Sequence, residues 1–506
     1  MKYLIQASLL TALPALVAAQ QDLHIRVENE DFRPRQIFSS VTTPSSTKGL
    51  TGVISTPAAL TSAVGDGNAV SSLSRSSSHT TLTAEPLATT PVPTFHLQST
   101  NPTAVPLASI NAAQPSLATK PLDSTVVAGT VPTFLPGAPA IPNVALLKPS
   151  NYPALDKIPP IDSPEVQRWI QEVKDTGIAV PEFTPTNPGY LGGCLNNSAS
   201  VGEDSRCWWT CGGCTRPTDI SDCPTALDWG LTYDDGPSFY TSNLLAYLDQ
   251  ENLKSTFFVV GSRVISFPAI LQTEYMSQHQ IGVHTWSHPP LTTLTNEQII
   301  AELGWTKKVI KDVLGVTPNM MRPPFGDIDD RVRAISLAMG LIPVMWTRIS
   351  PLATFDTDDF NVHSGATSVE QVLQNWGNIL SNVASRSSGF IVLEHDLFEQ
   401  TVEVATGYIL PDALAHKPRF TIQPVISCLK KKMSDAYIET NDNSTNPPAL
   451  SAAVNAGLTK ETKAPTPKKS SSDLLLLDQR AILMSLGTLA MGFGVGGLAF
   501  LRFSLV

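Results

Sequence analysis

The sequence has few basic residues and no long basic run. Lysine and arginine number 34 against 44 aspartates and glutamates, so the formal net charge is −10, and the longest basic run is Lys430–Lys432. Nucleic-acid-binding proteins usually carry a basic patch or stripe, so this composition argues against nucleic acid as the main partner. A negative net charge favours solubility and would weakly attract a cationic polymer, but it identifies no substrate.

A glycine-rich nucleotide-binding loop is also missing after the first apolar strand, Ala226–Tyr233, which argues against a doubly wound dinucleotide-binding fold. Apolar strands and amphipathic helices then alternate as far as Leu393, and this alternation predicts a parallel sheet. About seven such units within roughly 200 residues favour an α/β barrel. The expected strands are 256–260, 280–286, 320–321, 342–346 and 390–393. The expected helices are 240–250, 265–278, 332–339 and 369–383, with another that opens at a capping box on Thr295.

Cysteine is scarce, with six residues in the whole chain. Five lie between Cys194 and Cys223, and Cys428 stands alone downstream. In a reduced cytosol Cys211-Gly-Gly-Cys214 would suggest zinc or redox chemistry, whereas in the secretory pathway an even count suggests disulfides. Six cysteines allow 15 pairings. We expect one of the clustered cysteines to pair with Cys428.

Both ends of the chain resemble processing signals. Lys2, an apolar stretch over 4–17 and Ala18-Ala19 predict a signal peptide over 1–19, with a retained anchor as the alternative. At the other end, Ser470, Ser471 and Ser472 precede a spacer and an apolar tail, which predicts a glycosylphosphatidylinositol (GPI) anchor signal over 473–506. The alternative is a transmembrane helix, because the tail is long enough to span a bilayer.

Two segments rich in serine, threonine and proline flank a central domain. Residues 20–145 and 441–472 have few aromatic residues and no strong periodicity, so we expect disordered stalks around a catalytic domain over 150–430. Asn196 and Asn443 begin the two N-glycosylation sequons, which suits a secreted protein.

Four predicted strands end in polar residues, and chemistry in parallel α/β folds collects at these ends. The ends carry Asp234-Asp235, His284 with His288, Arg322 to Asp327, and His395-Asp396. Two histidines four residues apart can hold one metal ion, and a carboxylate from another strand would complete an open, catalytic coordination set.

The adjacent aspartates suggest a division of labour. Neighbouring side chains diverge, so one carboxylate can ligate the metal while the other takes a proton from a water that the metal acidifies. His395 could then protonate the leaving group. The plainer alternatives are a turn-forming Asp-Asp pair, a hydrogen-bonded strand-end histidine, and a rigid turn at Arg322-Pro-Pro.

Taken in order, the segments Thr232–Pro237, His284–His288, Arg322–Phe325 and Ile391–Asp396 resemble the motifs of the carbohydrate esterase family 4 polysaccharide deacetylases. Within this family the chain is most similar to fungal cell-surface, GPI-anchored chitin deacetylases. The resemblance implies a distorted (β/α) barrel of the NodB homology type. It also implies hydrolysis of the N-acetyl groups of chitin or chitin oligomers to chitosan and acetate during cell wall formation.

The resemblance also implies a role for each residue that matches a motif. Asp235, His284 and His288 would hold a divalent metal, zinc or cobalt, while Asp234 would be the general base and His395 the general acid. Among the supporting residues, Arg322 would orient the base and Asp359 would tune the acidity of His395. The Phe325 N–H would bind the oxyanion, and Leu393 would contact the acetyl methyl group. The protein would be a secreted monomer, held at the cell wall and plasma membrane by its lipid anchor.

Two motifs depart from the family pattern. The fourth reads Asp356-Thr-Asp-Asp359-Phe360, with Phe in place of Trp, and follows an additional segment over 347–355; Phe325 stands where Tyr is common. Two other functions stay open: a wall-binding protein with an inactive site, and a deacetylase of another N-acetylated polymer. Trp208-Trp209 could stack sugars or pack against the disulfides.

Overall fold

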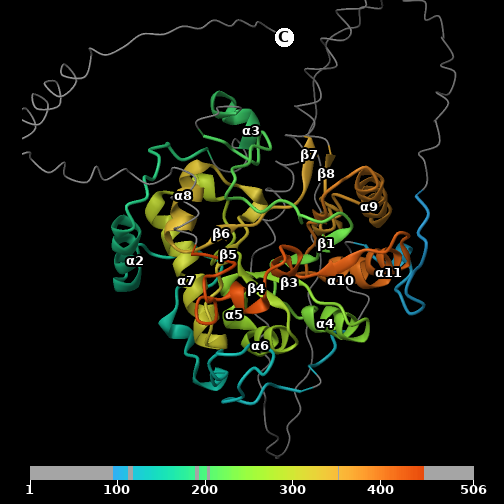
Figure 1. Ribbon diagram of the computed structural model, residues 1–506, viewed down its shortest axis with the longest axis horizontal. Helices are drawn as coiled ribbons and strands as arrows, with labels where there is room; N and C mark the ends of the chain where they lie inside the picture. Colours follow the sequence, from blue (N-terminus) through green and yellow to red (C-terminus); the bar gives the residue numbers. More distant parts are fainter. Residues whose placement is uncertain are drawn as a thin grey trace, which may run out of the picture. The chain divides into compact units, whose positions relative to one another are not determined.

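The computed structural model describes residues 95–111, 118–122, 124–187, 193–201, 206–350 and 353–448 (Figure 1). The expected signal peptide over 1–19, the anchor signal over 473–506 and the candidate attachment sites Ser470, Ser471 and Ser472 lie outside these residues. Within the described part of the chain, no helix has the length and apolar character needed to cross a membrane.

Short parallel strands form a closed ring at the centre of the fold. Strands β2 to β6 make one sheet in sequence order, and β10, β1 and β9 make another. The ring closes where the Thr347 N–H, beyond β6, donates to the carbonyl of Ile391 in β9, and where Asp234 bridges to His395. The predicted α/β barrel is therefore confirmed. The strands are β1 (Asp228–Gly230), β2 (Thr232–Asp234), β3 (Thr256–Val259), β4 (Gln280–Val283), β5 (Met320–Met321), β6 (Ile342–Pro343), β9 (Phe390–Ile391) and β10 (Thr421–Gln423).

The first strand is interrupted, which distorts the barrel. Residues 226–233 were expected to form one strand, but β1 and β2 are separate and Leu231 lies between them. The Leu231 N–H donates to Gln423 of β10, and its carbonyl accepts from Thr256 of β3. The chain thus changes partners in mid-strand, from β9 and β10 to β3. Several other strands are shorter than predicted, since β4 ends at Val283, β6 at Pro343 and β9 at Ile391.

Helices surround the ring and bury most of its apolar residues in one large core, while Ile342 of β6 lies in a small second cluster (Figure 1). The predicted helix over 265–278 is two helices, because Pro268 begins a new one. The Thr295 capping box is confirmed. The α-helices are α2 (Pro164–Asp175), α3 (Gly193–Asn196), α4 (Thr241–Gln250), α5 (Gly261–Ser266), α6 (Pro268–Met276), α7 (Asn296–Leu314), α8 (Asp330–Ala338), α9 (Val369–Val383), α10 (Glu399–Val404), α11 (Leu410–Ala415) and α12 (Val425–Cys428). The other helical turns are Leu107–Ser109, Val144–Leu146, Pro149–Asn151, Ser198–Ser200, Leu291–Thr293, Pro324–Gly326, Phe360–Val362, Ala405–Ile409 and Met433–Ala436.

The N-terminal strap, by which we mean the described residues 95–111, 118–122 and 124–145, packs on the barrel, so the prediction of disorder was wrong for these residues of the 20–145 segment. Four of its apolar side chains larger than alanine are at most 9% exposed in the core: Val105, Ile110, Leu135 and Ile141. Its backbone is also fixed, since the Asn101 N–H donates to Gly407 and Gln272 donates to the carbonyl of Pro142. A low-complexity composition hid this role because the few apolar residues pack against distant helices and not against one another.

The C-terminal boundary also lies beyond the expected residue 430. Tyr437 is fully buried, and its hydroxyl accepts a hydrogen bond from the Ile281 N–H in β4. Asn446, expected in the linker over 441–472, is 1% exposed and its side chain donates to the carbonyl of Asp435. The fold therefore includes the first residues of the expected linker.

All six cysteines form disulfides, which pair Cys194 with Cys211, Cys207 with Cys214, and Cys223 with Cys428. The last bond confirms that one of the clustered cysteines reaches Cys428. It lies at the N-terminal end of the barrel, where β1 begins close to α12.

The additional segment over 347–355 forms a hairpin of β7 (Arg348–Ser350) and β8 (Ala353–Thr354). Its Arg348 guanidinium lies 5.1 Å from the ring of Trp209 and donates to the Trp209 carbonyl. Trp208 and Trp209 are only 4% and 2% exposed. Of the two alternatives for this pair, packing beside the disulfides is therefore the one observed.

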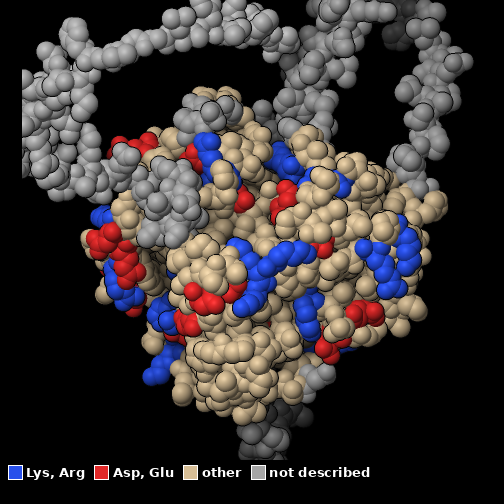
Figure 2. Space-filling model, in the orientation of Figure 1, with Lys and Arg blue, Asp and Glu red and all other residues tan. Residues whose placement is uncertain are grey.

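The surface carries no large single-sign field on the face shown in Figure 2, where Lys and Arg side chains are interspersed with Asp and Glu. Asn196 and Asn443, which begin the sequons, are both exposed.

We predict that a chain beginning at residue 150 will not fold stably, whereas one beginning at residue 95 will. Loss of the four buried side chains of the strap removes roughly 1.5–3 kcal/mol each. Their sum, about 6–12 kcal/mol, is comparable with the whole free energy of unfolding of a typical domain, about 5–15 kcal/mol. Secretion yield and thermal unfolding of residues 95–448 and 150–448 test this, and equal melting temperatures would contradict it.

Candidate active site

The polar strand ends converge at the C-terminal end of the barrel. Asp234 ends β2, and its N–H donates to Glu394 beyond β9 while its carbonyl accepts from Asp396. His284 follows β4 and Arg322 follows β5, where their N–H groups donate to Val259 and Val283 of the preceding strands. The strand ladders themselves therefore bring these side chains together, as the α/β prediction required.

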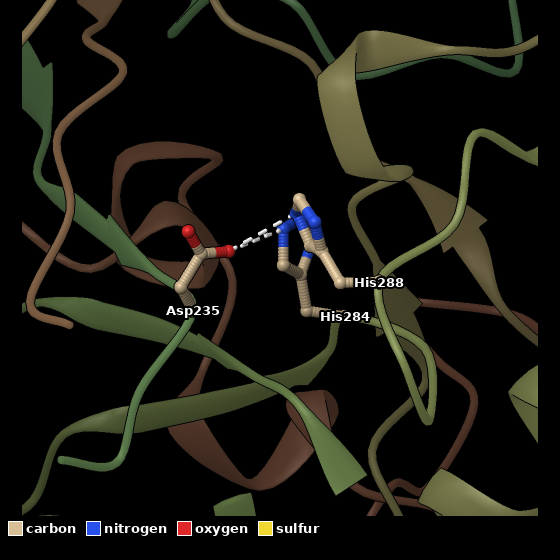
Figure 3. Close-up of side chains that lie close together, drawn as sticks. All are labelled: Asp235, His284 and His288. Carbon is tan, nitrogen blue, oxygen red and sulfur yellow. Dashed lines mark ion pairs between the residues drawn. The ribbon is translucent and has the colours of Figure 1, made fainter. Parts of the chain in front are cut away.

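Asp235, His284 and His288 form a cluster that can hold one metal ion (Figure 3). The Asp235 Oδ1 atom lies 3.2 Å from the Nε2 atoms of both histidines, and all three side chains are buried. The His284 Nδ1 atom lies 2.8 Å from the carbonyl oxygen of Arg322, which leaves Nε2 directed at the cluster. Two imidazoles and one carboxylate fit a catalytic metal with open coordination positions.

The two histidines hold the Asp235 carboxyl in its ionised form. Burial by itself would raise the pKa of this carboxyl, but the nearby imidazoles of His288 and His284 outweigh it and hold the pKa well below its usual range. Asp235 is thus an anion ready to bind a cation.

The turns that carry the site are conformationally strained. Asp235, Thr285, His288 and Phe325 all have left-handed backbone angles, with φ of 78°, 66°, 61° and 58°. None is glycine, and such residues cost of order 1–3 kcal/mol each unless their surroundings impose the conformation. The contacts of these turns therefore contribute to the geometry of the cluster.

Asp234 faces the cluster from a fixed position. Its Oδ1 atom accepts a 2.8 Å hydrogen bond from Arg322 Nη1, and its Oδ2 atom lies 3.9 Å from His284 Nε2. The same Arg322 nitrogen donates to the Thr232 hydroxyl at 2.8 Å. Arg322 has no exposed surface, so the pair is buried and shielded from water. Thr232 was not among the predicted site residues, although its place just before the paired aspartates was an available signal.

His395 is clamped by Asp359 despite the altered motif around Phe360. Asp359 Oδ1 lies 2.7 Å from His395 Nδ1, and Asp359 Oδ2 accepts from the His395 backbone N–H at 2.9 Å. Burial alone would lower the pKa of His395, but the Asp359 carboxylate outweighs it and raises the pKa to about 10. The Phe360 ring packs edge-on against the imidazole, with centroids 5.2 Å apart.

Asp396 supports the turn that carries the paired aspartates. Its Oδ1 atom accepts from the Gly236 N–H at 3.0 Å, and its Oδ2 atom accepts from the Thr241 hydroxyl at 2.5 Å. A Cβ atom on Gly236 would lie 2.3 Å from Oδ2, so only glycine fits this position. Burial raises the pKa of Asp396 to about 7, against the opposing hydrogen bond from Thr241.

The remaining expected residues border this centre. Leu393 is 5% exposed and lies two residues before His395, on the same side of an extended segment. Phe325 sits in the turn Pro324–Gly326, with its ring 4.8 Å from that of His288. Asn196 and Asn443 do not belong to the site.

We predict that the two adjacent aspartates differ in metal binding. Asp235→Asn and His288→Ala should abolish stoichiometric binding of a divalent metal, because each removes a ligand. Asp234→Asn should retain the metal, because this carboxylate is held by Arg322 and lies farther from the histidines. Metal content after dialysis tests this, and equal loss in the two Asn variants would refute the division.

Comparisons with known proteins agree with this site. The sequence pattern of the family described as polysaccharide deacetylase matches residues 222–344, which include the two aspartates, the two histidines and Arg322.

Several curated relatives are similar over longer stretches. Chitin deacetylase 1 of Cryptococcus neoformans var. grubii is 51% identical over 343 residues, which are 67% of this chain and 71% of the relative. Chitin deacetylase of Amylomyces rouxii is 38% identical over 41% of this chain and 54% of its own length, and chitin deacetylase 2 of Saccharomyces cerevisiae is 36% identical over 43% and 64%. With this degree of identity and coverage, and with the metal-binding cluster in place, the chain belongs to the polysaccharide deacetylase family of hydrolases.

Proposed function

We propose that this protein hydrolyses the N-acetyl groups of chitin, releasing acetate and leaving chitosan during cell wall formation. The observation that carries the proposal is the Asp235–His284–His288 cluster with Asp234 and His395 beside it. The 51% identity to a chitin deacetylase supports chitin as the polymer. Another N-acetylated polymer is the alternative substrate.

Asp235, His284 and His288 would hold zinc or cobalt. Such an ion, when bound, polarises the amide carbonyl and lowers the pKa of water. No other group of three metal-binding side chains occurs in the described part of the chain.

Asp234 is suited to be the general base. Arg322 fixes one carboxylate oxygen, and the other oxygen faces the histidine cluster, where the attacking water must lie. The Arg322 guanidinium is itself held by the carbonyls of Val344 and Met345, which fixes the orientation of the carboxylate. Asp234 then removes the proton from water as the C–O bond forms.

His395 is suited to protonate the leaving nitrogen. With Nδ1 bound to Asp359, the other ring nitrogen, Nε2, can donate the proton, and the imidazole lies within electrostatic reach of Asp235 and Asp234. A pKa of about 10 keeps the imidazole charged at neutral pH, so it can give up this proton when the C–N bond breaks. The Phe325 N–H would stabilise the oxyanion, and Leu393 would contact the acetyl methyl.

We infer a location outside the cytosol, which the disulfides support. Three disulfide bonds support secretion, since such bonds persist in oxidising compartments. We propose a secreted monomer, glycosylated at Asn196 and Asn443, with a GPI anchor at one of Ser470–Ser472 that holds it at the plasma membrane and cell wall.

We predict that the purified protein releases acetate from chitin oligomers, that a chelator stops this and that zinc or cobalt restores it. Asp234→Asn should lower kcat by roughly 10²–10⁴-fold, the usual contribution of a general base. Acetate is measured enzymatically, with metal content determined in parallel. If acetate is released from another N-acetylated polymer and not from chitin, that polymer is the substrate. Bound metal with no acetate from any polymer would favour a binding protein.

We predict that Asp359→Asn shifts the alkaline limb of the kcat/KM profile to lower pH by more than one unit. The acid must be protonated to act, and Asp359 raises the pKa of His395 against burial, which lowers it. Without this carboxylate the imidazole loses its proton at a lower pH. An alkaline limb that does not move in this variant would show that His395 is not the acid.

A further inference from the structure

Glu302 on α7 is a buried carboxylate outside the roles described so far. It has no exposed surface, and the described ion pairs give it no lysine or arginine partner. All three hydrogen bonds of its carboxylate go to the loop between the two histidines. Its Oε2 atom accepts from the N–H groups of Trp286 at 2.7 Å and Ser287 at 2.9 Å, and its Oε1 atom accepts from the Ser287 hydroxyl at 2.6 Å.

The loop that Glu302 contacts carries both imidazole ligands. Thr285 and His288 have φ of 66° and 61°, and Thr285 is β-branched, which makes this conformation especially unfavourable for it. The opposite edge of the loop is held by α5, where the N–H groups of Gly261 and Ser262 donate to the carbonyls of Thr285 and Trp286. Glu302 therefore holds the other edge of the loop, the one that α5 does not contact.

Without Glu302, the N–H group of Trp286, which is buried, and that of Ser287, which is half-buried, would both lose their acceptor. Buried donors are nearly always paired, so the loop would be expected to change conformation to reach water. Such a change would move His288, because it follows Ser287 directly and its own N–H is bound to the Thr285 hydroxyl at 3.1 Å. The distances of 3.2 Å between Asp235 and the two imidazoles would then no longer be maintained.

We propose that Glu302 is a positioning residue, whose carboxylate holds the His284–His288 loop in its left-handed conformation and thereby sets the affinity of the site for its metal. The inference rests on the proposed metal site. It concerns a residue on a different element, and Glu302 touches neither the metal ligands nor the place where substrate would bind.

Two substitutions of Glu302 distinguish whether its hydrogen bonds or its charge set the metal affinity. In Glu302→Gln the amide oxygen can occupy the place of Oε2 and accept both N–H groups, while the amide nitrogen donates to the Ser287 hydroxyl. Glu302→Leu has a similar size and accepts nothing. The positioning role therefore predicts that Gln preserves metal affinity and that Leu does not.

Glu274 on α6 provides a matched control. It is also a glutamate with no exposed surface, and neither of its carboxylate oxygens has a hydrogen-bond partner among the described residues. Glu274→Leu thus removes a buried carboxylate of the same kind from a neighbouring helix without removing a contact to the histidine loop.

The experiment measures the dissociation constant for zinc by competition with a chelator in the full chain, together with the absorption spectrum of the cobalt-loaded protein and the melting temperature. Glu302→Leu should bind zinc about 10- to 100-fold more weakly, as is usual when a group that orients a ligand is lost. Its cobalt spectrum should change. Glu302→Gln and Glu274→Leu should both stay close to the unaltered protein in affinity and spectrum.

Unchanged zinc affinity in Glu302→Leu would overturn the inference, and so would equal weakening in Glu302→Gln, which would assign the effect to charge. Equal weakening in Glu274→Leu would show a general loss of stability. If Glu302→Leu does not fold, Ser287→Ala, which removes one of the three contacts, must still weaken zinc binding. Failure of the unaltered protein to bind metal would instead overturn the proposed function.

Discussion

The buried guanidinium of Arg322 is the group on which the arrangement of the catalytic end depends. Its nitrogens donate to Thr232 and Asp234 of β2 and to carbonyls just beyond β6, and its own carbonyl faces His284 after β4. It also stacks over Phe258 of β3, 4.4 Å from the ring. A charge with no exposed surface is costly unless it is paired and hydrogen-bonded, so these strand ends are constrained to meet around it.

Two buried carboxylates perform a related task for the turns around this group. Asp396 accepts from Gly236 in the turn that carries the paired aspartates, and Glu302 accepts from the loop between the histidines. Both turns contain left-handed residues that are not glycine. Buried acceptors make such conformations tolerable, because the backbone N–H groups they satisfy would otherwise be unpaired. At both turns the fold thus accepts an unfavourable backbone conformation, which places the side chains of the site.

The accuracy of the sequence-based predictions followed the range of the interactions involved. The helix Val369–Val383 was predicted with its true bounds, and the Thr295 capping box is present, because both depend on contacts within a few residues. The first strand was predicted as one piece, yet it divides at Leu231 because β10 and β3 each pair with part of it. The strap over 95–145 was taken for a stalk, since its packing partners lie hundreds of residues away.

By itself, the sequence determined which residue types stand at the strand ends, and hence the chemistry: a carboxylate with two histidines for a metal, and a second carboxylate beside them. It could do so because strand direction and motif order are local properties of the chain. Only the tertiary structure decided that Asp235 lies closer to the imidazoles than Asp234, that Asp359 reaches His395, and that Glu302 supports the loop. These are distances between residues on separate elements, and they exist only once the barrel has closed.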